Sequence, residues 1–171
     1  MVDEILDYFS DGDLADAENL PVGPRYIGYV SKVDTSQSEA GNFRKYDKPV
    51  KDGRTEIPEI AVDVTAVGVV GEGKFSDDTN YYKTSSLNFR IGTPDRIGRH
   101  SLARLIEHAA GIPNDELLTI PIREAAKRLD KVYVTFDVKH REYTTRAGEK
   151  GIAQDFVKVR AATAEEVAEV V

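Results

Sequence analysis

The chain has 171 residues, of which 40% are hydrophobic, and its formal net charge is -7. This length suits one domain with a core of its own and short flanking segments. The absence of cysteine excludes disulfides and thiolate metal sites, and no apolar run approaches the roughly 18 residues of a membrane span.

The two ends of the chain are acidic, whereas the body between them is slightly basic. Residues 1–20 contain seven acidic residues and no basic ones, and residues 163–171 contain three glutamates. Residues 21–162 therefore carry a net charge of about +3. We expect residues 1–20 to be a flexible acidic segment, residues 21–162 to be the folded domain, and residues 163–171 to be an acidic tail or a short helix.

Three strands come first in the body. Arg25–Val33 is rich in β-forming residues, and Glu59–Val70 alternates between apolar and polar side chains. Tyr81–Ile91 ends in the same alternation. Between the first two strands lies a long polar loop that contains Gly41–Arg54.

The period then changes from two to that of a helix. Ser101–Ala110 has apolar residues at the spacing of an amphipathic helix, with Ser101 as the expected N-cap and Gly111 as the stop. Ile122–Leu129 shows the same spacing and predicts a second, short helix.

Two more strands follow the helices, at Lys131–Tyr143 and Gln154–Ala161. Three strands in a row argue against a parallel α/β architecture, in which strands and helices alternate. Five strands with helices between the third and the fourth is the order of the OB-fold. We therefore predict a mainly β protein, a five-stranded OB-fold Greek-key barrel with a helical insertion between strands 3 and 4.

Basic and aromatic residues concentrate in two loops. Gly41–Arg54 reads GNFRKYDKPVKDGR, and Lys139–Lys150 reads KHREYTTRAGEK. In an OB-fold the ligand lies across strands 2 and 3 and between these same two loops. Cations follow the phosphates of a single strand, and aromatic rings stack on its bases. The predicted nucleic-acid-binding residues are Arg44, Lys45, Tyr46, Lys48, Lys51, Arg54, Tyr81, Tyr82, Lys83, Asn88, Arg90, Tyr133, Lys139, Arg141, Tyr143, Arg146 and Lys150.

Several stretches resemble phage-encoded single-stranded DNA-binding proteins of the OB-fold type. They are VGPRYIGYVSKVD, the polar loop ending in DGR before IAVDVTAV, SLARLIEHAAGIPNDELL before KVYVTFDVKHREY, and the closing DFVKVRAAT. The resemblance covers about residues 21–162 and rests on element order and residue type. It implies binding of single-stranded DNA with little sequence preference, and protection of that DNA during phage replication or recombination.

The ends of the chain differ from many proteins of this type, which finish in an acidic tail with a terminal aromatic that recruits partners. This chain finishes in AEEVAEVV, and its strongest acidic segment is residues 1–20. We expect that segment to be a solvated tail; the alternatives are that it docks on replication or recombination proteins, or on the protein's own basic cleft as a mimic of DNA. It is acidic where a secretory signal is basic and then apolar, so we expect a cytoplasmic protein (the host cytoplasm, if the protein is viral) without membrane contact. Homo-oligomerisation and RNA as the ligand are left open.

We expect that the protein is not an enzyme and that it binds no cofactor. The three histidines, His100, His108 and His140, lack the spacing of metal ligands, and GVVGEG lacks the Lys and helix of a phosphate-binding loop. The alternative is a phage structural or adaptor protein that uses an OB-like barrel for protein contacts, because fold alone does not fix function.

Overall fold

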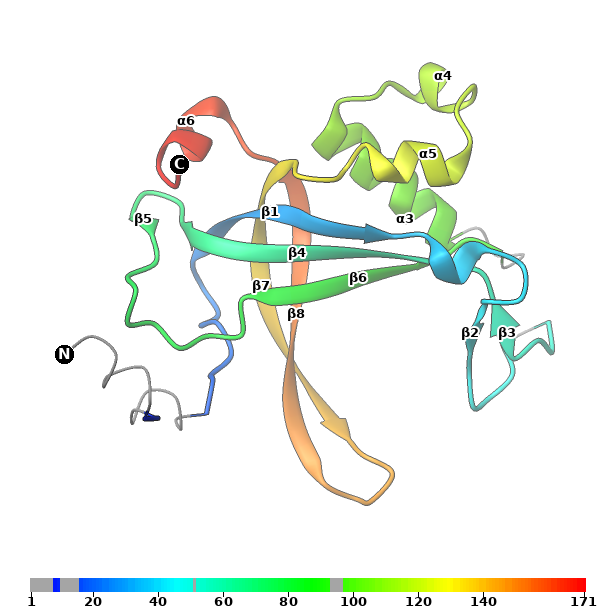
Figure 1. Cartoon of the computed structure of the whole chain (residues 1–171), viewed down its shortest axis with the longest axis horizontal. Coiled ribbons are helices and arrows are strands. Elements are labelled where there is room, and N and C mark those ends of the chain that lie inside the picture. Colours follow the sequence, from blue (N-terminus) through cyan, green and yellow to red (C-terminus); the bar gives the residue numbers. More distant parts are fainter. Residues whose placement is uncertain (1–7, 10–15, 51, 93–96) are drawn as a thin grey trace.

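The computed structural model describes residues 8–9, 16–50, 52–92 and 97–171 (Figure 1). The protein is mainly β, as the sequence predicts, and α3 to α5 are inserted between β6 and β7. None of the helices in these ranges is long and apolar enough to cross a membrane. In chain order the elements are β1 (Arg25–Asp34), η1 (Ser36–Ser38), β2 (Arg44–Lys45), β3 (Glu56–Ile57), β4 (Glu59–Val69), β5 (Gly73–Lys74), β6 (Thr84–Arg90), α3 (Ile97–Leu105), η2 (Ile106–Ala110), α4 (Asn114–Leu117), α5 (Ile122–Lys127), β7 (Tyr133–Thr144), β8 (Lys150–Ala161) and α6 (Ala164–Ala168).

The long strands form one antiparallel sheet. β4 pairs with β1 on one side and with β6 on the other, β1 also pairs with β7, and β7 pairs with β8. The short β5 pairs with the end of β4. In Figure 1 the β7–β8 pair crosses behind β1, β4 and β6 and continues below them as a long hairpin.

The core lies on the face of the sheet to which the alternating apolar residues point. Val62 and Val64 of β4 and Phe136 of β7 are fully buried, because a strand directs every second side chain to the same face. Leu102 of α3 and Ala126 of α5 belong to the same cluster, so the inserted helices close one side of this core.

The sheet is not closed into a barrel. No backbone ladder joins β6 to β8 within the described residues, so the predicted barrel is not confirmed. The two strands nevertheless approach, since the Ser85 Oγ donates a hydrogen bond to the Gln154 carbonyl oxygen at 3.4 Å.

Residues 16–20 lie beside this open seam. The backbone N–H of Tyr82, before β6, donates to the carbonyl of Glu18 at 2.9 Å. The N–H of Leu20 donates to the side-chain oxygen of Gln154 on β8, also at 2.9 Å, and the Leu20 side chain is fully buried. The end of the predicted acidic segment is therefore part of the folded domain, whereas residues 1–7 and 10–15 lie outside the described residues.

The C-terminal residues form the short helix α6, which packs on the sheet. Thr163 and Glu166 form a capping box at its start. The buried Val170 lies where a side chain on Gly68 of β4 would be, so the glycine makes room for it.

Three local predictions were wrong. The last strand begins at Lys150 and not at Gln154, because it pairs with β7 up to Thr144. The first helix begins at Ile97, not after Ser101, because Gly98 has no side chain and lets the helix pass against the backbone of Arg90. The third strand begins at Thr84 and not at Tyr81, because Tyr81 forms a bridge with Glu18 instead. Gly111 ends the first helix in a left-handed conformation with φ of 69°, as predicted.

Candidate nucleic-acid interface

The first predicted loop folds into a small hairpin, which we call the first arm (residues 44–57). Its strands β2 and β3 are only two residues each, too short to show a period in the sequence. A buried carboxylate holds the base of this arm. Glu59, at the start of β4, is 1% exposed and accepts a hydrogen bond from Arg44 Nη1 at 2.7 Å and another from the Tyr46 hydroxyl.

Arg90, at the end of β6, completes this cluster. Its Nε donates to the Tyr46 hydroxyl at 3.3 Å, and its guanidinium carbon lies 4.4 Å from the centre of the Tyr46 ring. The Arg44 guanidinium carbon lies 5.2 Å from the same centre. The Tyr46 ring therefore already interacts with two cations of the protein, which limits its availability to a base.

Burial and the hydrogen bond to Glu59 raise the pKa of the Tyr46 hydroxyl, although Arg90 opposes this shift. The hydroxyl consequently stays protonated and donates a hydrogen bond to the Glu59 carboxylate. The hydrogen bond to Glu59 also raises the pKa of Arg44, which is 43% exposed. The cluster combines one buried negative charge with two guanidinium groups, and its net positive charge lies where β4, β6 and the first arm meet.

The other cations of the first arm differ in their partners. Lys45 forms a 3.9 Å ion pair with Glu56, and Arg54 forms one of 2.7 Å with Asp52 and also bonds to the Gly92 carbonyl. Lys48 is exposed and forms no ion pair with any described residue. Lys51 lies outside the described residues.

The second predicted loop is the end of the β7–β8 hairpin, which we call the second arm (residues 139–155). Every residue from 139 to 150 is exposed. Arg141 forms a 3.0 Å ion pair with Asp155 on the opposite strand, and this hydrogen bond raises the pKa of Arg141. Lys139 and Lys150 form no ion pair with the part of the chain that is described.

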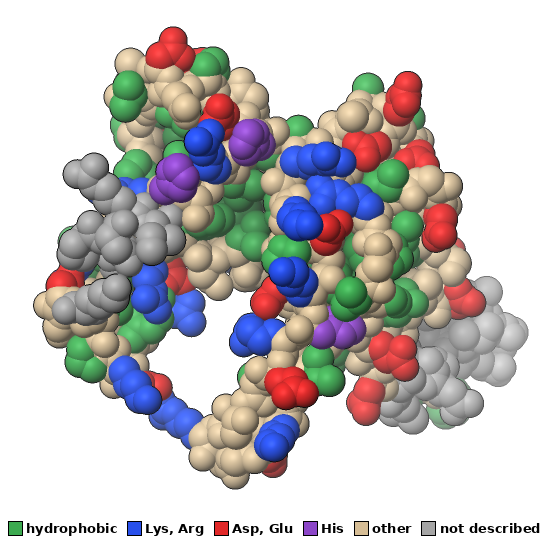
Figure 2. Space-filling model, turned by 180° about the vertical axis from the view of Figure 1, so that it is seen from behind, with side chains coloured by type: hydrophobic (Ala, Val, Ile, Leu, Met, Phe, Trp, Pro, Cys, Tyr) green, Lys and Arg blue, Asp and Glu red, His purple; other side chains and the backbone are tan. Residues whose placement is uncertain are grey.

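The tips of the two arms meet. Arg146 of the second arm forms an ion pair with Asp47 of the first, although the two residues are far apart in the sequence. Figure 2 shows an opening through the molecule between the arms, with Lys and Arg side chains along its rim. The two loops predicted from sequence to flank one site therefore enclose one space.

The candidate tyrosines fall into two groups. Tyr82 and Tyr143 are 55% and 44% exposed. The Tyr143 ring lies over Gly151 of the neighbouring strand, where any other residue would place a Cβ. These two rings are accessible to a base.

The other predicted residues near the sheet pack against the protein. Tyr81 lies 5.9 Å from Phe75, measured between ring centres, and Tyr133 lies 5.9 Å from Tyr29. Lys83 lies 5.9 Å from the Phe75 ring. The remaining candidate is Asn88, exposed on the same outer face of β6 as Arg90.

Sequence reasoning missed two residues that shape the arms, Glu59 and Asp47. Glu59 follows Pro58 and precedes a run of buried strand residues, so a carboxylate at the start of an apolar strand was the available signal. Asp47 stands among the five cations of its loop, and nothing in the sequence connects it with Arg146.

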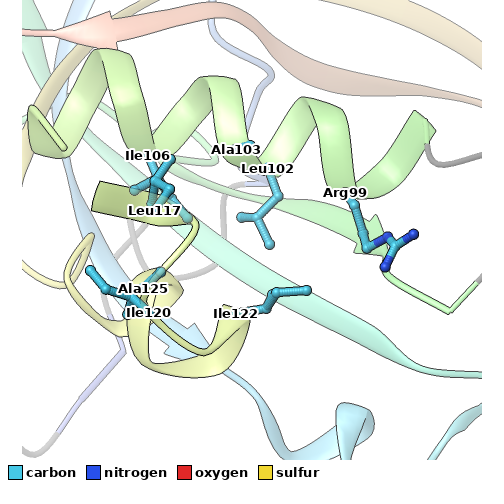
Figure 3. A pocket seen from close by; sticks show the side chains of 8 residues that line it. All are labelled: Arg99, Leu102, Ala103, Ile106, Leu117, Ile120, Ile122 and Ala125. Carbon is cyan, nitrogen blue, oxygen red and sulfur yellow. The ribbon is translucent and has the colours of Figure 1, made fainter. Parts of the chain in front are cut away.

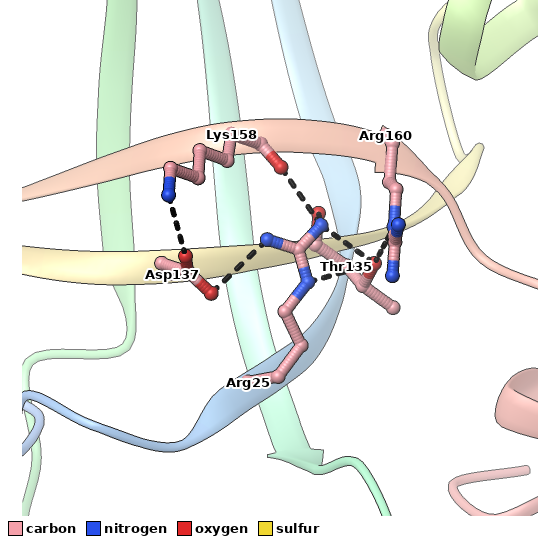
Figure 4. A network of polar contacts seen from close by, with 5 residues as sticks. All are labelled: Arg25, Thr135, Asp137, Lys158 and Arg160. Carbon is pink, nitrogen blue, oxygen red and sulfur yellow. Dashed lines mark hydrogen bonds and ion pairs between the residues drawn. The ribbon is translucent and has the colours of Figure 1, made fainter.

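A separate polar network lies where β1, β7 and β8 meet (Figure 4). Arg25 donates from Nη1 to Asp137 at 3.1 Å and from Nη2 to the carbonyls of Thr135 at 3.0 Å and Lys158 at 2.7 Å. The β7–β8 register shifts at this point, and Lys158 has a left-handed φ of 53°. Arg25 thus satisfies backbone oxygens around a β-bulge, which gives it a structural role.

The inserted helices leave one small apolar cavity of about 90 Å³ (Figure 3). Leu102 and Ile106 border it from the first helix, Leu117 and Ile122 border it from α4 and α5, and Arg99 lies at its edge. An engineered cavity that binds benzene measures about 150 Å³, so this one is too small for a base.

No protein-family model and no curated protein matches this chain. Within the described residues, no group of three or more His, Asp or Glu side chains is arranged to hold a metal ion. The geometry of the two arms is therefore the basis for a functional proposal.

Proposed function

We propose that the protein binds single-stranded DNA with little sequence preference and protects it during replication or recombination, as the phage proteins that it resembles would. The observation that carries this proposal is the contact between Asp47 and Arg146, which brings two basic loops together around one opening. The proposed role requires neither catalysis nor a cofactor.

The proposal includes the finer interpretation of the fold, an OB-type Greek key. The sheet order β6–β4–β1–β7–β8 and the helices between β6 and β7 support it. In this interpretation β6 and β8 are the strands that would meet in a closed barrel. The contact between Ser85 and Gln154 supports that view.

The geometry divides the candidate residues by role. Lys48, Lys139 and Lys150 are the exposed cations of the two arms without an ionic partner in the described chain, so we assign them to the phosphates. Tyr82 and Tyr143 are the exposed rings, and we assign them to base stacking. Arg44 and Tyr46 mainly shape the first arm, because Glu59 already binds both.

Fluorescence anisotropy with a labelled single strand, its duplex and an RNA of the same sequence tests the proposal. We expect the single-stranded DNA to bind more tightly than the duplex. The slope of log K against log salt concentration should be about -0.7 for each phosphate contact. Equal affinity for duplex and single strand, or no binding in about 50 mM salt, would contradict the proposal. Tighter binding of the RNA would instead make RNA the ligand.

One observation favours the rival, an adaptor or structural protein. Five of the predicted cations, Arg44, Lys45, Arg54, Arg141 and Arg146, are already paired with carboxylates. Cations that are already neutralised by carboxylates attract phosphates less, which favours protein contacts at this surface. The rival predicts no salt-dependent binding of any strand in the same anisotropy experiment.

A further inference from the structure

We infer that the two arms form a ring that opens and closes, that the ion pair between Asp47 and Arg146 is its latch, and that a single strand passes through the opening. This inference rests on the proposed function. It adds the path of the strand and the way in which a strand without ends enters the site.

Both arms are held at their bases by contacts within the fold, so their tips stay close enough to meet. In the first arm, Tyr46 N–H donates to the Thr55 carbonyl at 2.8 Å and Val50 N–H donates to that of Arg54 at 3.0 Å. Glu59 then joins this arm to β4 through Arg44, as described above. The first arm is therefore a folded hairpin and not a loose loop.

The second arm is braced in two ways. Its strands pair in continuous register from Val138 to Thr144, which is about 20 Å at roughly 3.3 Å per residue. Its base is also bonded to the segment beside the seam, through Asn19 Nδ2 to the Ile152 carbonyl and His140 Nε2 to the Leu20 carbonyl, both at 2.8 Å. An arm of this length and support can enclose a space rather than lie on the sheet.

The latch is made of side chains that water reaches. Arg146 and Asp47 are 83% and 75% exposed, and exposed ion pairs contribute little stability and are weakened by salt. The ring is therefore closed by its weakest contact, whereas both bases are held by ladders or a buried carboxylate. A phosphate that competes with Asp47 for Arg146 would open the ring as the strand arrives.

The rim of the opening has the charge that a polyanion requires. Figure 2 shows Lys and Arg side chains around it, and the exposed Lys48, Lys139 and Lys150 belong to the two arms. A flexible single strand can follow such a rim and place its bases on nearby rings.

The chain has no cysteine, so two introduced cysteines would be its only thiols. A thiol cross-linker can therefore lock the ring at a chosen position. We would prepare the double variant Asp47→Cys/Arg146→Cys and join its thiols with a short bis-maleimide. Such a spacer is preferable to a disulfide, because a disulfide needs Cα atoms within about 7 Å and the arginine side chain is long. The two single variants, treated with the same reagent, are the matched controls.

Before cross-linking, the double variant should bind circular and linear single strands with equal affinity. After cross-linking, the affinity for circles should fall at least tenfold relative to linear strands, because only a strand with an end can enter a closed ring. Cross-linked protein that binds circles as tightly as linear strands would overturn the inference, as would loss of binding to linear strands.

Cross-linking after loading gives the converse result. In roughly 1 M salt the Debye length is about 3 Å, so electrostatic attraction no longer holds the DNA. Protein locked on a circle should nevertheless remain bound, whereas protein locked on a linear strand should slide off. Release from the circle would also overturn the inference. If instead the parent and the uncross-linked variant bind no strand at all, the proposed function fails, which is a distinguishable outcome.

Discussion

Replacement of Arg44 by Ala should destabilise the protein far more than an exposed arginine normally would. The structure supplies the reason, since Arg44 donates at 2.7 Å to Glu59, which is 1% exposed. Without Arg44, the buried Glu59 carboxylate keeps, among the described residues, only the Tyr46 hydroxyl as a donor. Removing one partner of a buried pair costs about 3–5 kcal/mol, and we expect a value near the lower end because Arg44 itself is half exposed.

Urea denaturation of the parent and of Arg44→Ala measures this cost directly. For a protein of this size, about 3 kcal/mol corresponds to a fall in Tm of roughly 6–12 °C. Lys45→Ala is the matched control, because Lys45 is the next residue and its pair with Glu56 is 3.9 Å long and exposed. It should change the free energy of unfolding by less than about 0.5 kcal/mol.

A second substitution tests the cause. In Arg44→Ala/Glu59→Gln the buried group is neutral and its amide oxygen still accepts from Tyr46, so part of the lost stability should return, less the cost of the unpaired amide N–H groups. The reasoning would be refuted if the double variant were as unstable as Arg44→Ala, or if Arg44→Ala were as stable as Lys45→Ala.

Three further predictions concern pH, the bulge network and salt. Burial above all raises the pKa of Tyr26 to about 12, so the hydroxyl stays protonated in the folded state after it has ionised in the unfolded one. Stability should therefore fall between about pH 10 and about pH 12, by up to ~1.4 kcal/mol per pH unit, and Tyr26→Phe should reduce this fall in urea titrations. Arg25→Ala should cost about 1.5–3 kcal/mol by the same assay, and Arg25→Lys should not restore it, because an ammonium cannot reach the several acceptors that the guanidinium bridges. Replacing Lys48, Lys139 and Lys150 together by Ala should flatten the salt dependence of DNA binding by about 0.7 per contact, about 2 in all, and an unchanged slope would place the phosphates elsewhere.

The strands could be predicted closely because burial alternates along them. The strand predicted at Glu59–Val70 is Glu59–Val69, since the even-numbered residues from Ile60 to Ala66 are buried and the odd-numbered ones between them are not. The two arms were likewise recognisable from composition. Residues 16–20 were not, because an acidic composition predicts solvation, whereas Leu20 is held by the core and by partners on β8 more than 100 residues away.

The individual roles within the arms depend on contacts that composition cannot show. Arg44 and Lys48 are equivalent cations in the sequence, yet one is bound to a buried carboxylate and the other has no ionic partner in the described chain. Tyr46 and Tyr143 are equivalent rings, yet guanidinium groups lie over the first and the second is accessible. Pairing across the fold decides which residues remain available to a ligand.

This pairing changes the salt dependence that the proposed function requires. If all eleven basic residues predicted from the sequence contacted phosphates, the slope of log K on log salt would be about -8. If only Lys48, Lys139, Lys150 and the released Arg146 do, it is about -3, and stacking on Tyr82 and Tyr143 must supply much of the affinity. The carboxylates within the arms therefore reduce the electrostatic attraction between the protein and DNA, and their ion pairs fix the shape of the arms. Binding that depends on shape and stacking should persist at salt concentrations that abolish a purely electrostatic contact.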